Sequence, residues 1–179
     1  MKLLGFDDTR EISFAKNILD KIEDTLRKKI DNLNAICFVV QSSNTRLTVF
    51  QKYIFNSIMN LFGDDIAENF IAMITFFDGG KIAIYDDLLE KGSGFDLVKD
   101  KIKGDWCFKF NNSAIFSENG NDYSDKFNEN FWNLGMLSFA KFMNKLISLP
   151  QKSLSQSREV LNQRKQINLK IKSLKNELD

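Results

Sequence analysis

The sequence predicts an α/β fold in which helices cover both faces of a parallel sheet. Three segments, residues 35–41, 69–77 and 105–110, are rich in β-branched and aromatic residues, as are strands buried in parallel sheets. Between the first two, the apolar residues of segment 48–62 recur at helical spacing. A strand, a helix and a strand in this order form a right-handed crossover unit. The first strand is a continuous apolar run, so we expect it to be covered on both faces.

Composition limits the chemistry available to the chain. Its 179 residues suffice for one domain with a short appendage, and a hydrophobic content of 43% supplies a sizeable core. A net charge of +1 gives no global field for nucleic acid. The chain contains no histidine, so it lacks both the commonest general base and the commonest zinc ligand. We therefore expect neither a metal site nor a nucleic-acid partner.

Cysteine usage and the shortness of the apolar runs indicate a cytoplasmic protein. Cys37 and Cys107 are too few for a disulfide scaffold, which favours a reducing compartment. The apolar residues at the start of the chain are far fewer than a signal peptide needs. No apolar run approaches the roughly 20 residues of a membrane span, so none is expected.

Helical patterns precede, fill and follow the central unit. Residues 11–29 form an amphipathic helix with one apolar face. That face carries Ile12, Ala15, Ile18, Leu19, Ile22 and Leu26. Residues 81–91 predict a shorter helix after the second strand. In the central helix, Thr48 and Gln51 have the spacing of a capping box, and Gly63 is placed to end the helix as a left-handed cap.

The C-terminal part of the chain is also expected to be helical. Residues 127–149 are apolar over a broad arc, so this helix should be largely buried. Pro150 marks a boundary, and beyond it five apolar residues lie near a 3.5-residue seam that Arg164 interrupts. They are Val160, Ile167, Ile171, Leu174 and Leu178. Residues 150–179 are thus either a coiled coil of about three heptads or a solvated helix lying back on the domain.

Polar residues follow two of the predicted strands at their carboxyl ends. Asp78 comes after the strand at 69–77, and residues 111–114 come after the next strand. Ligands of open α/β sheets bind at this edge. An aspartate there can accept two hydrogens from guanine N1 and N2, and a backbone amide near Ser113 and Ala114 can donate to guanine O6. Taken alone, a strand-end aspartate is more often a cap or a turn residue.

Four short motifs resemble those of one protein family. They are Arg46-Leu-Thr48, Leu61-Phe-Gly63, Thr75-Phe-Phe-Asp78 and Phe110-Asn-Asn-Ser-Ala114, and they follow one another at a familiar spacing. The chain resembles the septin-like branch of the P-loop GTPases, and within it the immunity-associated nucleotide-binding (GIMAP, or avirulence-induced) family. The resemblance covers about residues 5–149.

The resemblance implies a fold and a domain organisation. Residues 1–149 would be an incomplete three-layer GTPase domain that supplies the last three strands of a six-stranded sheet, and residues 150–179 a C-terminal helix. The strand at 69–77 would separate Cys37 from Cys107 by more than a disulfide can span. Because the strand that pairs with residues 35–41 in the family would be missing, this segment would be a long apolar edge that invites pairing with another chain.

The resemblance also assigns roles by position. Thr75 and Asp78 match the guanine-reading motif, and Asn112, Ser113 and Ala114 match the last base-contacting motif. On the phosphate side, a remnant of the switch motif is matched by Gly5, Asp8 and Thr9, with the amide of Gly5 facing the γ-phosphate. Arg46-Leu-Thr48 matches a box between these motifs, and helix capping is the alternative interpretation.

Three departures from the family pattern limit the expected activity. Phe76 and Phe77 replace the basic residue usual inside the base motif. The switch motif lacks Asp-Thr-Pro, and with it the aspartate on the magnesium side. No GxxxxGK[ST] occurs, so the phosphate-binding loop would lie before Met1. The resemblance thus implies no catalytic residue, weak binding of GTP or GDP, and Mg²⁺ only in a full-length relative.

The missing phosphate contacts set the expected affinity. A guanosine of about 20 heavy atoms, at about 0.3 kcal/mol per atom, contributes about 6 kcal/mol, which is a Kd on the order of tens of micromolar. The expected function is guanine-nucleotide binding by a fragment that does not hydrolyse GTP alone. The alternative is a non-enzymatic interaction module that forms homo-oligomers through its C-terminal helix or its sheet edge.

Overall fold

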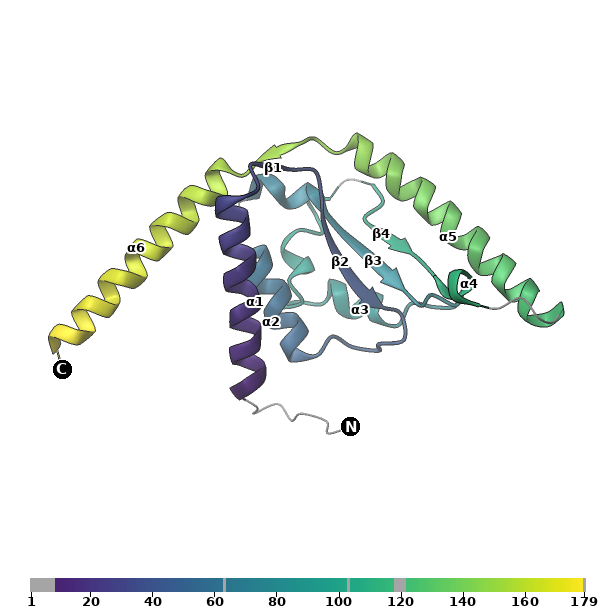
Figure 1. Ribbon diagram of the computed structural model, residues 1–179, viewed down its shortest axis with the longest axis horizontal. Coiled ribbons are helices and arrows are strands. Elements are labelled where there is room, and N and C mark those ends of the chain that lie inside the picture. The colour runs from purple at the N-terminus through teal and green to yellow at the C-terminus, as the bar shows by residue number, and fades with distance from the viewer. Residues whose placement is uncertain (1–8, 63, 103, 118–121, 179) are drawn as a thin grey trace.

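The computed structural model describes residues 9–62, 64–102, 104–117 and 122–178 (Figure 1). In chain order its elements are α1 (Thr9–Lys28), β1 (Asn32–Leu33), β2 (Ile36–Gln41), α2 (Val49–Met59), the 3-10 helix η1 (Asp64–Asn69), β3 (Phe70–Thr75), α3 (Ile84–Leu89), the 3-10 helix η2 (Phe95–Leu97), β4 (Cys107–Lys109), α4 (Ser113–Phe116), α5 (Asp122–Ser148), β5 (Lys152–Ser153) and α6 (Ser155–Leu178).

Three strands form one parallel sheet in the order β2-β3-β4. The pairing of β2 with β3 runs from Ile36 opposite Phe70 to Gln41 opposite Thr75, and β4 continues the sheet on the other side of β3. Helices pack on both faces, so the predicted α/β class is confirmed. The expected strand order is confirmed as well, because β3 lies between the strands that carry the two cysteines, and both thiols are free.

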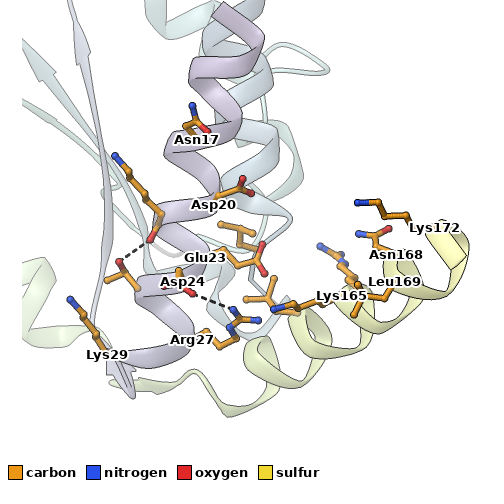
Figure 2. Close-up of a pocket in the computed structure, with 15 residues that line it drawn as sticks. Asn17, Asp20, Glu23, Asp24, Arg27, Lys29, Lys165, Asn168, Leu169 and Lys172 are labelled. Carbon is orange, nitrogen blue, oxygen red and sulfur yellow. Dashed lines mark hydrogen bonds and ion pairs between the residues drawn. The ribbon is translucent and has the colours of Figure 1, made fainter.

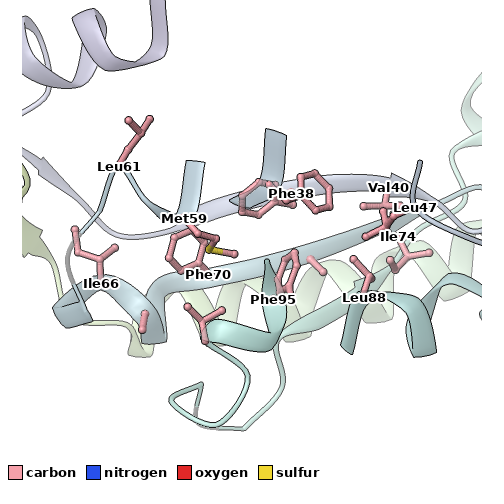
Figure 3. Packing of buried hydrophobic residues seen from close by; sticks show 14 of the residues in the cluster. Phe38, Val40, Leu47, Met59, Leu61, Ile66, Phe70, Ile74, Leu88 and Phe95 are labelled. Atoms are coloured by element: carbon pink, nitrogen blue, oxygen red, sulfur yellow. The ribbon is translucent and has the colours of Figure 1, made fainter. Parts of the chain in front are cut away.

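One face of the sheet, which we name the α2 face, packs against α2, α3 and η2. Phe38 and Val40 of β2 are buried on this face, as is Ile74 of β3 (Figure 3). The ring of Phe38 lies 4.6 Å from that of Phe55 in α2 and 5.3 Å from that of Phe95 in η2, measured between centroids. Buried aromatic rings remove about 150–250 Å² each from water. This cluster of rings therefore holds α2 and η2 on the sheet.

The start of α2 confirms the predicted capping box. The Gln51 N–H donates to Thr48 Oγ1 (3.1 Å), and the Thr48 N–H donates to Gln51 Oε1 (2.8 Å). Each bond satisfies one of the amides that the first turn of a helix leaves unpaired. The other end differs from the prediction, because α2 stops at Met59 with Asn60 as a right-handed C-cap. Gly63, the predicted cap, lies outside the described residues.

The opposite face of the sheet, which we name the α5 face, is covered over β3 and β4 alone. Phe108 and Leu149 are buried there, and the ring of Phe108 meets that of Phe142 edge to face at 5.7 Å. β2 turns Cys37 and Val39 toward this face, where the thiol is exposed and Val39 is 65% exposed. The expectation that the first strand is covered on both faces is therefore wrong.

The burial predicted for the C-terminal helix of the domain is also wrong. Trp132 and Phe139 of α5 are about half exposed, and Leu137 is exposed to 66%. α5 packs mainly on α4 and β4. The sheet that α5 covers is small, with three strands and only three residues in β4. It can therefore bury one stripe of the broad apolar arc of α5, and the rest of the arc stays exposed.

Of the two alternatives left open for the C-terminal segment, the start of α6 matches the helix that lies back on the domain, and the coiled coil stays a prediction. The first turns of α6 dock on the domain, where Ser157 and Leu161 are buried, as is Leu154 just before the helix. Arg158 holds this part of α6 to the end of α1, because its guanidinium donates to the carbonyl oxygens of Leu26 and Ile30. From residue 162 to residue 177 every side chain is exposed, and the helix projects away from the sheet (Figure 1). No helix among the described residues is long and apolar enough to cross a membrane.

Asn69 joins three segments at the amino ends of the strands. It is fully buried, and its Nδ2 donates to the carbonyl oxygen of Asn34 (2.6 Å) and to that of Pro150 (2.9 Å). Asn34 precedes β2, and Pro150 precedes β5, which pairs with β1. One side chain thus ties η1 to the entry of the sheet and to the linker between α5 and α6.

We expect Asn69→Ala to destabilise the protein by about 1–3 kcal/mol, because it leaves two carbonyl oxygens without their donor. Urea unfolding monitored by circular dichroism measures this change. Asn34→Ala is the matched control, since it removes an exposed side chain and keeps the carbonyl group that Asn69 binds. Equal unfolding midpoints for Asn69→Ala and the wild type would contradict the assignment.

Candidate functional site

The two polar segments predicted to form a site do meet at the carboxyl ends of β3 and β4. The Phe110 N–H donates to the Ile74 carbonyl (2.7 Å), and the Phe77 N–H donates to the Phe110 carbonyl (3.0 Å). These bonds extend the pairing of the two strands beyond β4. The turn that carries Asp78 and the turn that begins at Asn111 are therefore held side by side.

Asp78 is exposed at the tip of the first turn. Phe76 has a φ of 55°, and this left-handed residue turns the chain so that Phe77 returns to the core. One carboxylate oxygen of Asp78, Oδ1, accepts the Gly80 N–H at 2.9 Å. Among the described residues, the other oxygen has no hydrogen-bond partner. The turn role considered from the sequence is thus present, and one oxygen still faces solvent.

Asn111 is the residue that aligns the two turns. Its Nδ2 donates to the Phe77 carbonyl (3.0 Å), and its Oδ1 accepts the Ser113 N–H (3.0 Å). Sequence reasoning placed Asn111 inside the base motif but gave it no separate role. An asparagine whose oxygen binds the amide two residues later is typical of an Asx turn, and that spacing was the available signal.

The same bond bears on the prediction that a backbone amide near Ser113 and Ala114 donates to guanine O6. The Ser113 N–H is already bound to Asn111, so it is not available to a guanine oxygen in this arrangement. Ala114, the next residue, follows it in the short helix α4. Asn112 precedes α4 as its N-cap residue, is exposed, and makes no capping bond with its side chain.

Thr75 lies within the sheet rather than in the turn. Its Oγ1 donates to the Val40 carbonyl of β2 at 3.3 Å. Ser42, which sequence reasoning did not single out, follows β2 and donates from Oγ to the Phe76 carbonyl at 2.6 Å. The left-handed turn at Phe76 is thus braced by the loop after β2, and Thr75 has a structural role in the same region.

The phosphate-side residues cannot be placed in this site. Gly5 and Asp8 lie outside the described residues, as does the side chain of Thr9, whose backbone begins α1. The box at residues 46–48 has the structural role that was its alternative interpretation, because Thr48 caps α2 and Leu47 is 4% exposed.

Asp87 of α3 holds that box in place. It accepts the Leu47 N–H, and Lys52 binds both Asp87 (3.3 Å) and Glu90 (3.0 Å). Burial acts to raise the pKa of Asp87, but the bonds from the Leu47 amide and from Lys52 outweigh it, so the pKa is lowered. This carboxylate is therefore a charged structural bridge between α2 and α3, and its charge is already paired.

The cysteine thiols are weak candidates for covalent chemistry. Burial raises the pKa of Cys107 to about 11, although Lys109 nearby acts in the opposite direction. Partial desolvation raises the pKa of Cys37 as well, although this residue is exposed. A thiol is a poor nucleophile until it loses its proton. Within the part of the chain that the structure describes, no three or more acidic or cysteine side chains are grouped to hold a metal ion.

A hollow of about 590 Å³ opens beside the Asp78 turn, between α3 and β4. Gly80 and Lys109 line its near side, and Tyr85 and Trp106, stacked at 5.5 Å, line its wall. A larger hollow of about 1100 Å³ lies between α1 and α6 (Figure 2). Its lining is mostly charged and includes no residue from the strand ends, so we place the candidate site at the Asp78 turn.

Comparison with known proteins adds no assignment. No protein-family model matches the chain, and no curated protein matches it.

We expect Asp87→Ala to destabilise the protein by about 1–3 kcal/mol in urea unfolding at neutral pH, because the Leu47 amide loses its acceptor. The pKa of Asp87 is lower in the folded state than its ordinary value of 3.8, so the carboxylate stabilises the fold at any pH above 3.8. This stabilisation is lost as the pH falls through the lowered pKa. The difference between wild type and Asp87→Asn should therefore shrink below about pH 4.

The neighbouring Asp86→Asn serves as the control for this pH dependence. The Asp86 side chain is 75% exposed, and its ion pair with Lys81, at 3.4 Å, is open to solvent. Exposed pairs contribute little to stability. The assignment fails if Asp86→Asn and Asp87→Asn give the same stability at every pH.

Proposed function

We propose that this chain is a guanine-nucleotide-binding protein of the GIMAP and septin-like GTPase class, and that it holds the base at the carboxyl ends of β3 and β4. The observation that carries the proposal is the alignment of the two turns by Asn111. That alignment sets the exposed Asp78 carboxylate beside the segment that contains Asn112 and Ala114. Both segments belong to the motifs on which the family resemblance rests.

The chemistry of guanine fits the groups present. A carboxylate offers about four lone-pair positions, so Asp78 can keep its bond to Gly80 and still accept the N1 and N2 hydrogens of guanine. The Ala114 N–H takes the role of donor to guanine O6, since the Ser113 amide is bound to Asn111. Phe76, 64% exposed, offers a ring against which the face of the base can stack.

The proposed binding is weak and is not followed by hydrolysis. The sequence contains no GxxxxGK[ST] loop to hold the phosphates, so the contacts involve the guanosine part alone. The corresponding Kd is on the order of tens of micromolar.

We expect calorimetry to give a Kd for GDP no tighter than about 10 μM, with ADP binding more weakly. Asp78→Asn should remove the preference for guanine, because the amide puts a donor where guanine needs an acceptor. The loss should be about 10- to 100-fold, the range for a hydrogen bond to a charged group.

Glu177→Gln is the control for this experiment, since it removes one negative charge from an exposed position near the outer end of α6. Equal affinity of the wild type for GDP and ADP would overturn the proposal. So would GTPase activity that disappears in Asp78→Asn.

A second function, self-association through α6, is favoured by the exposure of its outer part. Ile167, Ile171 and Leu174 lie on the predicted seam and are each about half exposed. Arg164, which interrupts the seam, donates to the Asn60 carbonyl at 2.6 Å and so belongs to the docked part of the helix. The seam that remains is short for a coiled coil.

If α6 forms a coiled coil, we expect sedimentation equilibrium to show the full chain as an oligomer and a chain ending at residue 165 as a monomer. A cut at residue 151 is unsuitable, because it removes Leu154 and Leu161 from the core. Ile171→Asp in the full chain should have the same effect as the truncation. An association state that is the same in both variants as in the full chain excludes the coiled coil.

A further inference from the structure

The hollow of about 1100 Å³ between α1 and α6 has walls that carry unpaired charges of opposite sign. Asp20 and Glu23 of α1 line one wall, and Lys165 and Lys172 of α6 line the other. Figure 2 shows these carboxylates and lysines directed into the space between the two helices. Within the part of the chain that the structure describes, none of the four side chains makes an ion pair or a hydrogen bond. The two helices thus present charges that attract each other and do not meet.

The other charged groups of this hollow are bound or lie to the side. Asp24 is held at 3.2 Å by Arg27 of its own helix, and Arg164 is bound to a carbonyl oxygen of the domain. Lys29 follows the end of α1 and points away from α6 (Figure 2). Lys21 falls on the flank of α1, about 100° around the axis from the neighbouring carboxylate. The unpaired charges of α1 that face α6 are therefore acidic.

The closed end of the hollow sets which groups can meet. There Arg158 is bound to the carbonyl oxygens of residues 26 and 30, so it lies level with about residue 28 of the α1 end. At 1.5 Å per residue, Lys165 lies about 10 Å farther out along α6. By the same measure, Glu23 and Asp20 lie about 8 and about 12 Å out along α1. The ammonium group of Lys165 is therefore level with the space between the two carboxylates.

The next turn outward is complementary as well. Asn168 of α6 and Asn17 of α1 both line the hollow, at similar distances from its closed end. Their amides can each donate to and accept from the other. Leu169 lines the hollow beside them and is 59% exposed, so an approach of the two helices removes apolar surface from water.

The charge of α6 favours the domain itself as the surface that its outer part contacts. Residues 162–177 include five lysines and arginines and one carboxylate. Because the whole chain has a net charge of +1, the rest of the chain is net negative. Attraction between such exposed groups reaches about 30 Å at 0.01 M salt and only about 3 Å at 1 M. The distance between α6 and α1 should therefore respond to ionic strength.

We propose that α6 is a strap that closes on α1, so that Lys165 enters between Asp20 and Glu23 and the hollow disappears. The strap pivots about Leu161, which is buried, and loses the exposed bond from Arg164 to the Asn60 carbonyl. Exposed ion pairs contribute little each, so open and closed arrangements are both populated and salt shifts the balance between them. The closed strap covers this wall of α1, and its closure involves neither the strand-end turns nor nucleotide binding.

A zero-length carbodiimide cross-linker tests the contact, because it joins an amine to a carboxylate only where the two meet. Peptide mass spectrometry of the wild type at about 10 mM salt should find Lys165 joined to Glu23 or Asp20. The yield should fall about threefold or more at about 1 M salt, where the attraction is screened. The pair of Lys152 with Glu68, at 2.9 Å, is the internal reference, since both residues belong to the domain. Equal yields at both salt concentrations, or a link that forms only between isotopically distinct copies, overturn the proposal.

Small-angle X-ray scattering of dilute protein provides a second test with charge variants. At low salt the maximum dimension of the wild type should be shorter than at high salt by on the order of 10 Å, because the projecting part of α6 is about 20 Å long. Lys165→Glu should remove this difference, and adding Asp20→Lys and Glu23→Lys should restore it.

Lys170→Glu is the matched control for the scattering experiment. It changes the charge of the same helix by the same amount, but Lys170 does not line the hollow and lies about 140° around the axis from Lys165. This variant should shorten at low salt as the wild type does. A wild type of constant dimension overturns the proposal. So does an effect of Lys170→Glu equal to that of Lys165→Glu, or a triple variant that stays extended.

Discussion

The parallel pairing of β2 with β3 determines where the other elements can lie. It aligns Phe38 and Val40 with the buried side chains of β3, and this alignment creates the apolar surface on which α2, α3 and η2 pack. The same pairing brings the loop after β2 to the end of β3, where Ser42 braces the turn at Phe76. A shift of one residue in this register would move Phe38 to the opposite face. The core and the candidate site therefore depend on the same ladder of hydrogen bonds.

Polar side chains hold the remaining segments to this framework. Asn69 links η1 to the segments that follow β1 and precede β5 through their carbonyl oxygens, and Arg158 links the start of α6 to the end of α1 in the same way. Asp87 joins α2 to α3. In each case a single side chain satisfies backbone groups at element ends, where hydrogen-bond partners within the element run out.

The sequence predicted the elements better than it predicted their surroundings. The three strands and the capping box at Thr48 follow from local patterns, because propensity and hydrogen bonding at a helix end act over a few residues. The exposure of Val39 could not be predicted in this way. An apolar run shows that both faces of a strand are apolar, but whether each face is covered depends on elements far away in the chain. The bond from Asn111 to Phe77 likewise joins residues 34 positions apart.

α6 also has a mechanical consequence. The part beyond Arg164, from residue 165 to residue 177, extends for about 20 Å at 1.5 Å per residue. A load at residue 177 acts on a lever whose fulcrum is the contact of Leu161 and Arg164 with the domain. The load reaches α1 and the two-residue β1–β5 ladder, which adjoin the amino ends of the strands. Force applied at the outer end of α6 would therefore separate this short ladder first, while the sheet shields the turns at Asp78 and Asn111 from the load.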